Sequence, residues 1–151
     1  MANGERLSFL LRQARLDDID AVYAVERECF RDPYPPELLK LLLLLPGVFL
    51  VAVHEDKVIG YVAVVVRNNM GHVFSVAVVE RFRRRGIGRA LLKEAIDALR
   101  RRGIKDFRLE VRESNHAAQQ LYRSLGFKEE GKIPGYYSDG EAALVMKLSL
   151  P

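Results

Sequence analysis

Hydrophobic residues along the chain alternate between a period of two and a period near 3.6, which indicates strands interspersed with helices. Weak alternation predicts a first strand over residues 8–15. Helical spacing then predicts a helix from Asp17, a good N-cap residue, to Phe30. The prolines that follow, at 33, 35 and 36, must end that helix because proline fixes φ and lacks an N–H. A leucine-rich helix is expected over 37–45, ended by Pro46-Gly47.

The rest of the chain changes from a β-meander to alternating helices and strands. We expect strands at 48–53, 58–66 and 72–79, with turns at 54–57 and 68–71 between them. An amphipathic helix at 86–102 follows, closed by Gly103. A strand at 107–111, a short helix at 117–125 and a strand at 141–148 complete the order. This order predicts an α/β or α+β domain around one central sheet, and the 151 residues suit a single domain, 1–151.

Composition excludes several classes of protein. Apolar residues make up 49% and charged residues 29%, which is ordinary for a globular chain. A single cysteine, Cys29, excludes an internal disulfide and a multi-cysteine metal site. The three histidines lack zinc-motif spacing, so we expect no metal. The longest apolar run, 41–53, is too short to span a membrane, and 1–11 lacks a signal-peptide core, so we expect a cytoplasmic protein.

Positive charge is concentrated in one part of the chain. Residues 81–108 hold eleven bases and three acids, a balance of +8 (eleven minus three). Such a block suggests an anionic partner, although a solvated helix face would explain it equally well. No aromatic residues alternate with these arginines as a stacking platform, which counts against single-stranded nucleic acid.

A glycine pair lies where the predicted strand at 72–79 gives way to the long helix. Gly86-Ile87-Gly88 opens that helix, and the N–H groups and dipole at a helix N-terminus attract phosphate. A dinucleotide fingerprint would need glycine where Leu91 stands, and the Gly-Lys-Ser/Thr of a P-loop is absent. A phosphate-bearing ligand is therefore expected here, with a simple tight turn as the alternative.

Four blocks together resemble one family. Arg83-x-x-Gly86-x-Gly88 after an apolar strand resembles motif A of the GNAT superfamily of acetyl-CoA-dependent N-acetyltransferases. Residues 109–127 look like that family's acyl-CoA signature, and residues 135–142 and 32–35 resemble segments of its protein N-terminal acetyltransferases. The blocks are most similar to ribosomal-protein alanine acetyltransferases and archaeal-type N-terminal acetyltransferase catalytic subunits. The resemblance implies the GNAT fold, a mixed, mostly antiparallel twisted sheet flanked by about four helices.

The resemblance also implies acetyl-CoA as co-substrate and assigns residues to it. Pantetheine would run along the strand before motif A, and the pyrophosphate would meet the backbone N–H groups of the glycine loop. Asn115 would contact pantetheine, although by itself it could be only a helix N-cap. The implied acetyl-CoA residues are Val76, Ala77, Val78, Arg84, Arg85, Gly86, Ile87, Gly88, Arg89, Asn115 and Tyr122.

Three side chains are candidates for proton transfer. Alternation turns Glu110 away from the core face of its strand, and the resemblance makes it the general base, with an exposed acid as the alternative. The resemblance makes Tyr122 the acid for the leaving thiolate, against a packing tyrosine. His72 would relay a proton, against a turn-adjacent histidine, and alternation predicts residues 72, 74 and 76 on one face. His54 and His116 are expected to take no part, and Cys29 to pack in the core rather than act as a nucleophile.

The predicted reaction is direct acetyl transfer to the α-amine of a protein N-terminus. At pH 7 roughly a tenth of α-amines are neutral, against well under a thousandth of lysines, so one glutamate suffices for the former. The resemblance places Asp32, Tyr34, Tyr136 and Tyr137 around the peptide. The partners would be protein or peptide N-termini, ribosomal proteins among them, with an auxiliary subunit possible. The alternatives are a small-amine or lysine acetyltransferase, a basic nucleic-acid-binding module and an acyl-CoA sensor.

Overall fold

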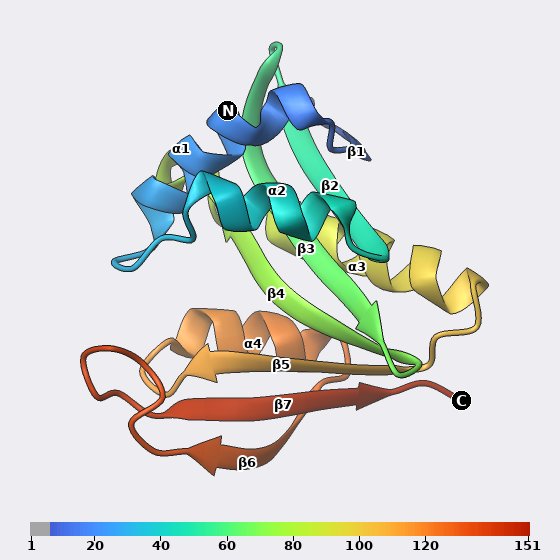
Figure 1. The fold of residues 1–151 in the computed structure, drawn as a ribbon, viewed down its shortest axis with the longest axis vertical. Coiled ribbons are helices and arrows are strands. Elements are labelled where there is room, and N and C mark those ends of the chain that lie inside the picture. The colour runs from blue at the N-terminus through green and yellow to red at the C-terminus, as the bar shows by residue number, and fades with distance from the viewer. Residues whose placement is uncertain (1–6) are drawn as a thin grey trace.

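The computed structural model describes residues 7–151 (Figure 1). Residues 1–6 lie outside the described residues. They include the start of the predicted domain, 1–151, and part of segment 1–11, in which no signal-peptide core was found. The strands are β1 (Leu10–Gln13), β2 (Gly47–His54), β3 (Lys57–Arg67), β4 (Met70–Val78), β5 (Asp106–Arg112), β6 (Lys128–Ile133) and β7 (Ala143–Ser149). The helices are η1 (Leu16–Asp18), α1 (Ile19–Cys29), α2 (Pro36–Leu44), η2 (Glu80–Phe82), α3 (Ile87–Arg101) and α4 (His116–Ser124).

The strands of residues 7–151 form one seven-stranded sheet in the order β1-β2-β3-β4-β5-β7-β6. Every neighbouring pair is antiparallel except β4 and β5, which are parallel. A parallel pair needs a crossover connection, and α3 supplies it. The expected mixed, mostly antiparallel sheet with four α-helices is confirmed for the described part of the chain.

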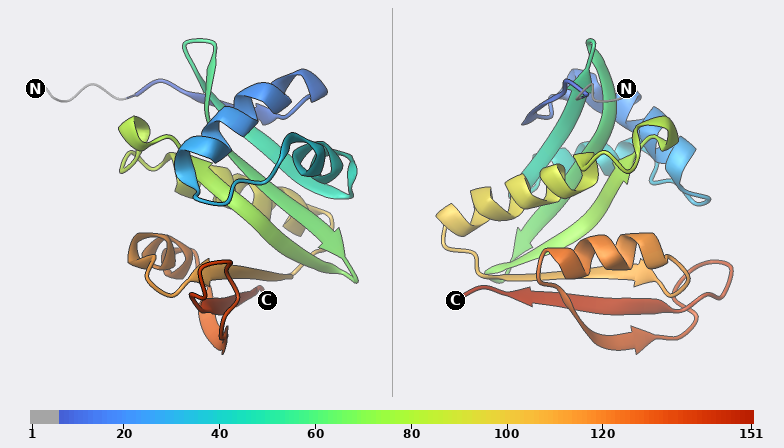
Figure 2. Two further views of the ribbon diagram at one scale, coloured as in Figure 1. Left: turned by 60° about the vertical axis from the view of Figure 1, so that its left-hand side comes forward. Right: turned by 180° about the vertical axis from the view of Figure 1, so that it is seen from behind.

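Helices cover both faces of the sheet (Figure 2). Leu39 of α2 and Val22 of α1 are buried with β2 and β3 residues in one core cluster. Leu91 and Leu99 of α3 are buried in the other cluster, which reaches across to α4 and β7. Their spacing gives α3 the apolar stripe expected from the sequence.

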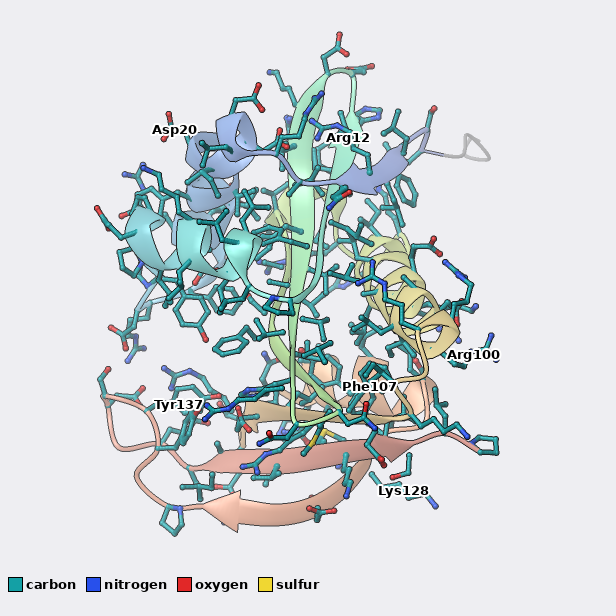
Figure 3. The ribbon with its side chains drawn as sticks, turned by 45° about the vertical axis from the view of Figure 1, so that its right-hand side comes forward. Arg12, Asp20, Arg100, Phe107, Lys128 and Tyr137 are labelled. Carbon is teal, nitrogen blue, oxygen red and sulfur yellow. The ribbon has the colours of Figure 1, made fainter. Side chains whose placement is uncertain are left out.

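The two halves of the sheet join at a short parallel pairing. β4 and β5 pair only from Met70 opposite Asp106 to His72 opposite Arg108, and then diverge toward their C-terminal ends (Figure 1). Gly71 packs on Phe107, and a Cβ at Gly71 would lie 2.5 Å from the ring. Phe107, labelled in Figure 3, is fully buried. A glycine therefore lets the two halves approach at the junction, beyond which the strands part.

One extra residue in β4 corrects the predicted alternation. Between Ala63 and Val64 of β3 the pairing register shifts, so that Phe74 forms a β-bulge. The prediction that residues 72, 74 and 76 share a face is wrong because the bulge shifts the alternation by one residue. Phe74 packs with the α1 and α2 cluster, whereas Val76 packs with the α3 cluster. The rings of His72 and Phe74 remain neighbours, with centroids 4.6 Å apart.

The start of the first helix also differs from prediction. Asp17 is exposed and its carboxylate does not cap the helix; the neighbouring Asp18 is buried instead. Asp18 accepts the Arg15 N–H at 2.7 Å and forms two hydrogen bonds with the Arg12 guanidinium, at 2.8 and 2.9 Å. Two adjacent aspartates look alike in sequence, and only tertiary packing selects the one that meets Arg12.

Candidate active site

The diverging ends of β4 and β5 enclose a cavity of about 600 Å³. Its walls come from these two strands, from α1 and α4, and from the loops after α1 and β6. Eight of the residues predicted to act line it: Asp32, Tyr34, Val76, Glu110, Asn115, Tyr122, Tyr136 and Tyr137. The fold thus gathers candidates separated by about a hundred residues in the sequence at one place.

Glu110 forms a hydrogen-bonded pair with His72. The alternation of β5 buries Leu109 and Val111 and turns Glu110 to the cavity, as predicted. One carboxylate oxygen lies 2.7 Å from His72 Nε2, and the other accepts from Arg108 Nε at 3.0 Å. Burial by itself would raise the pKa of Glu110, but the hydrogen bonds and charges of His72 and Arg108 outweigh it and lower that pKa. The carboxylate is therefore ionised at neutral pH.

Two tyrosines of the cavity keep their protons at neutral pH. Tyr122 on α4 is buried beside Phe127, and burial raises its pKa to about 12. Tyr136 is 47% exposed, and partial burial together with the negative charge and hydrogen bond of Glu110 raises its pKa. Both phenols are therefore proton donors rather than bases near pH 7.

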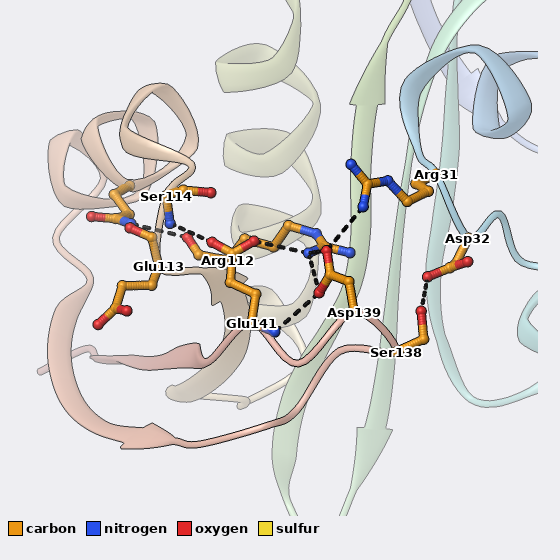
Figure 4. Close-up of polar contacts among 9 residues, drawn as sticks. Arg31, Asp32, Arg112, Glu113, Ser114, Ser138, Asp139 and Glu141 are labelled. Carbon is orange, nitrogen blue, oxygen red and sulfur yellow. Dashed lines mark hydrogen bonds and ion pairs between the residues drawn. The ribbon is translucent and has the colours of Figure 1, made fainter.

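Loops from the two halves of the sheet meet across the cavity (Figure 4). The Ser138 hydroxyl donates to the Asp32 carboxylate, and Arg31 pairs with Asp139 at 3.2 Å. We call these two cross-cleft contacts, Asp32–Ser138 and Arg31–Asp139, the loop clasp. Arg112 of β5 holds the far side of the clasp through Asp139 at 2.9 Å.

The same arginine also supports the predicted peptide-binding tyrosine. Arg112 pairs with Glu141 at 2.9 Å, and its guanidinium lies 4.1 Å from the centre of the Tyr137 ring. Glu141 in turn accepts the Ser114 N–H at 2.8 Å. Arg112, Ser138 and Glu141 stood in the matched sequence blocks, but nothing in the pattern indicated that they would contact each other.

A buried carboxylate beneath the cavity was missed by the sequence analysis. Glu26 is 2% exposed and lines the cavity wall. Its carboxylate accepts from the Tyr61 hydroxyl and from the Tyr34 N–H, the latter at 2.9 Å. Burial raises the pKa of Glu26 despite these hydrogen bonds and a further one from Ser75. The sequence did contain a sign of this burial, because Glu26 lies four residues after Val22 on the apolar face of α1.

The predicted phosphate loop lies at the start of α3, outside the cavity lining. Gly86 is the N-cap residue in a left-handed conformation with φ of 79°, which glycine adopts without strain. Arg84 also has a positive φ, 64°, and Ile87 is buried in the core, while Arg85 and Arg89 are exposed. A Cβ on Gly88 would contact Leu121 of α4 at 3.6 Å and Val76 of β4 at 3.9 Å. The helix N-terminus therefore adjoins the cavity wall.

The remaining candidates lie between this loop and the cavity. Val76 lines the cavity, and the side chains of Ala77 and Val78 are buried. The Val78 carbonyl accepts from Arg83 Nε at 2.8 Å and from the Cys29 thiol at 3.4 Å. Cys29 is only partly buried and lines the cavity, and burial raises the pKa of its thiol.

Asn115 has the helix-capping contact predicted for it. Its side-chain oxygen accepts the Ala118 N–H at 3.1 Å at the start of α4. Because Asn115 also lines the cavity, one side chain holds α4 in place and faces the open space.

Residues 7–151 hold neither a metal-binding cluster nor a membrane-spanning helix. Over residues 7–151, no three His, Cys, Asp or Glu side chains gather in a way that could hold a metal ion. The longest helix described, α3, has 15 residues, and no helix in this part of the chain has the length and apolar character needed to cross a membrane.

Comparison with known proteins identifies the family. Residues 19–127 match the acetyltransferase (GNAT) family. The chain is 36% identical over 152 residues to an N-alpha-acetyltransferase of Saccharolobus solfataricus, with 91% of each chain covered. The ribosomal-protein-S18-alanine N-acetyltransferase of Escherichia coli superposes with a TM-score of 0.88 at 31% identity, over 95% of this chain and 94% of that one. Ard1 from Thermoplasma volcanium gives a TM-score of 0.90 at 29% identity, covering 95% and 98%. The chain therefore belongs to the GNAT acetyltransferase family, as its four sequence blocks indicated.

Proposed function

We propose that this protein transfers the acetyl group of acetyl-CoA to the α-amine of protein N-termini. The observation that carries the proposal is Glu110, which lines the cavity that opens where β4 leaves β5 and is hydrogen-bonded to His72 beside that cavity. The relatives whose names state such an activity, the archaeal N-alpha-acetyltransferase and the S18-alanine acetyltransferase, support it.

The segment from the end of β4 to the start of α3 suits a CoA-type ligand. Residues 84–89 would hold the diphosphate through the N–H groups and dipole of α3 and through fixed arginine charge. The missing Cβ at Gly88 leaves room against Leu121 and Val76 that a side chain would fill. In the described part of the chain the β4 edge facing β5 has no strand partner beyond His72, so this edge would be available to pantetheine from Val76 onward. The Val78 carbonyl is the exception, because it accepts from Arg83 and Cys29. Asn115, the N-cap residue of α4, and Tyr122 on α4 would contact the ligand from the other side.

The Glu110–His72 pair would accept the proton of the attacking amine. Acetyl-CoA, when bound, supplies a thioester carbon for the amine to attack and a thiolate to leave. The lowered pKa of Glu110 keeps its carboxylate ionised, and it also makes this carboxylate a weak base by itself. Histidine exchanges protons nearest to neutral pH, and Glu110 fixes the orientation of the His72 ring. We assign the two side chains a shared role as base, acting through water.

Tyr122 would supply the proton that the leaving sulfur needs. Its hydroxyl stays protonated because burial raises its pKa to about 12. It lines the same cavity as Glu110, from α4. Acid and base are thus carried by different elements, α4 and β5.

The peptide would enter between the loops that carry Asp32, Tyr34, Tyr136 and Tyr137, all of which line the cavity. An α-amine needs only a weak base, because roughly a tenth of it is already neutral at pH 7. The pairing of an ionised, weakly basic Glu110 with His72 suits that task better than deprotonating lysine. Ribosomal-protein N-termini are candidate substrates, and an auxiliary subunit could present them.

A thiol-release assay tests this proposal. Acetyl-CoA is supplied with peptides that differ in their first two residues, with spermidine, and with an N-terminally blocked peptide as control. We expect release with free-amine peptides above that with spermidine. Binding of acetyl-CoA without thiol release on any amine would favour an acyl-CoA sensor, and release on spermidine alone would favour a small-amine enzyme.

A further inference from the structure

Glu26 is a buried carboxyl group for which the proposed chemistry has no use. It lies on α1, is 2% exposed and touches none of the three proton-transfer candidates by hydrogen bond in the described part of the chain. A buried carboxylate costs free energy unless donors compensate it, and an apolar side chain of similar volume would often stabilise a fold as well or better. Its contacts therefore need a reason other than stability.

The contacts of Glu26 join three segments. One oxygen accepts from the Tyr61 hydroxyl of β3, and the other accepts the Tyr34 N–H in the loop between α1 and α2. Ser75, directly after the β4 bulge, adds a third donor. A carboxylate suits this arrangement because it can accept a hydroxyl on one oxygen and a backbone N–H on the other. Glutamine would present an NH₂ to one of these donors.

Tyr34 carries the effect from this carboxylate to the active site. Its hydroxyl donates to the Phe74 carbonyl at 3.4 Å, and Phe74 is the bulged residue whose ring packs on His72. The peptide-side loop is thus held through its backbone by Glu26 of α1 and through the Tyr34 side chain by β4, the strand that carries His72. The loop also holds Asp32, which forms part of the clasp.

We propose that Glu26 is a positioning residue that fixes the loop of residues 30–35 relative to the Glu110–His72 pair. It sets where the first residue of the substrate lies and does not bind acetyl-CoA or transfer a proton. This inference rests on the proposed function, because it assumes that the substrate amine arrives between the loop and the pair.

Kinetics of Glu26→Gln test the role. Losing one hydrogen bond to a charged group should raise the peptide KM about tenfold, with the acetyl-CoA KM within about twofold of wild type. Tyr61→Phe, which removes a donor without changing the ring, should shift the peptide KM in the same direction by less. Glu28→Gln is the matched control, since Glu28 lies on the same helix and accepts the Glu80 N–H at 2.8 Å but faces away from the cavity. Its peptide KM should not change.

Hydrogen–deuterium exchange of residues 30–35 gives a second readout that needs no substrate. Exchange should be faster in Glu26→Gln and Tyr61→Phe than in wild type and Glu28→Gln. The inference is overturned if Glu26→Gln and Tyr61→Phe both leave the exchange and the peptide KM unchanged. It is also overturned if the KM values for peptide and for acetyl-CoA rise equally. If Glu26→Gln does not fold, Tyr61→Phe alone decides. If wild type releases no thiol with any peptide, the proposed function fails, while the exchange result still decides whether Glu26 holds the loop.

Discussion

Glu110 is the residue on which the proposed chemistry depends most. Its two oxygens are divided between His72 and Arg108, so the carboxylate has a fixed orientation before any substrate binds. The cations lower its pKa against the effect of burial. A carboxylate of this kind remains charged at every pH where an α-amine can react.

Glu110→Gln should lower kcat by about 100- to 10,000-fold while acetyl-CoA affinity is nearly kept, as expected for general base catalysis. Steady-state kinetics between pH 6 and 9, with acetyl-CoA binding measured separately, check this. Near-full activity across that range would remove Glu110 as the base and leave His72, which His72→Ala and the double variant would then test. Equal losses in the single and double variants would indicate one shared function.

The buried Asp18 gives a stability prediction at the same scale. Asp18→Asn should cost about 1.5–3 kcal/mol at pH 7, because it weakens hydrogen bonds to a charged partner, whereas Asp17→Asn should stay within about 0.5 kcal/mol. The Arg12 hydrogen bonds lower the pKa of Asp18, so its stabilisation is present above the unfolded-state value and is lost as the pH falls through the folded-state value. Denaturant unfolding at several pH values measures the difference. An equal cost for both variants would contradict the structure.

Among the elements, the start of α3 is the one whose function follows most directly from local sequence. Gly86 needs its left-handed conformation to begin the helix, and Gly88 leaves open the space toward β4 and α4. Both properties depend on residues within one turn of the helix. This is why a glycine-arginine pattern alone could indicate a phosphate-binding helix terminus.

Acetyl-CoA should stabilise the wild-type fold, and Gly88→Asp should abolish the effect. Ligand at 100 times its dissociation constant adds about 2.7 kcal/mol, or a rise in Tm of roughly 5–10 °C for a domain of this size. The carboxylate introduced by Gly88→Asp would repel a phosphate, so acetyl-CoA binding should be lost. The variant should still fold, because an acidic side chain near a helix N-terminus is stabilising. Gly88→Ala is the control, since its Cβ meets only ordinary contacts. A shift retained in Gly88→Asp, or an equal shift from an oligonucleotide, would contradict the assigned site.

Most elements could be predicted from the sequence because each has a strong local pattern. The strand β6 could not, since Lys128, Glu129 and Glu130 give it no apolar face and it forms the sheet edge, where charge discourages further pairing. The Phe74 bulge was equally hidden, because an apolar run looks the same with or without an extra residue. That one missed residue was enough to misplace Val76 relative to His72.

At the scale of the whole molecule, the split of the sheet creates the site. β1 to β4 with α1 and α2 form one wall, and β5 to β7 with α4 form the other (Figure 2). The loop clasp joins the walls across the cavity at Asp32–Ser138 and Arg31–Asp139 (Figure 4). The resemblance could assign Asp32 to the peptide side. The two clasp contacts could not be predicted from sequence spacing, because their partners are 106 positions apart (Asp32–Ser138) and 108 positions apart (Arg31–Asp139).

Asp32→Val should move preference from Ser- or Ala-starting peptides toward Met-Leu-starting ones by about 1–3 kcal/mol, the range of one pocket contact. Ser138→Ala separates the two roles of Asp32, because it removes the clasp hydrogen bond and leaves the carboxylate in place. The ratio of kcat/KM for the two peptide classes is measured on both variants. An unchanged ratio in Asp32→Val excludes Asp32 from the pocket, and equal losses on both peptides in both variants would mean that it serves only the clasp.

The most direct test of the account is the position of the transferred acetyl group. A peptide with a free N-terminus and an internal lysine is incubated with enzyme and acetyl-CoA, and fragment masses locate the added group. The account predicts acetyl on the α-amine, loss of reaction when the N-terminus is blocked, and loss of rate in Glu110→Gln. Acetyl on the lysine, or equal reaction of the blocked peptide, would contradict it.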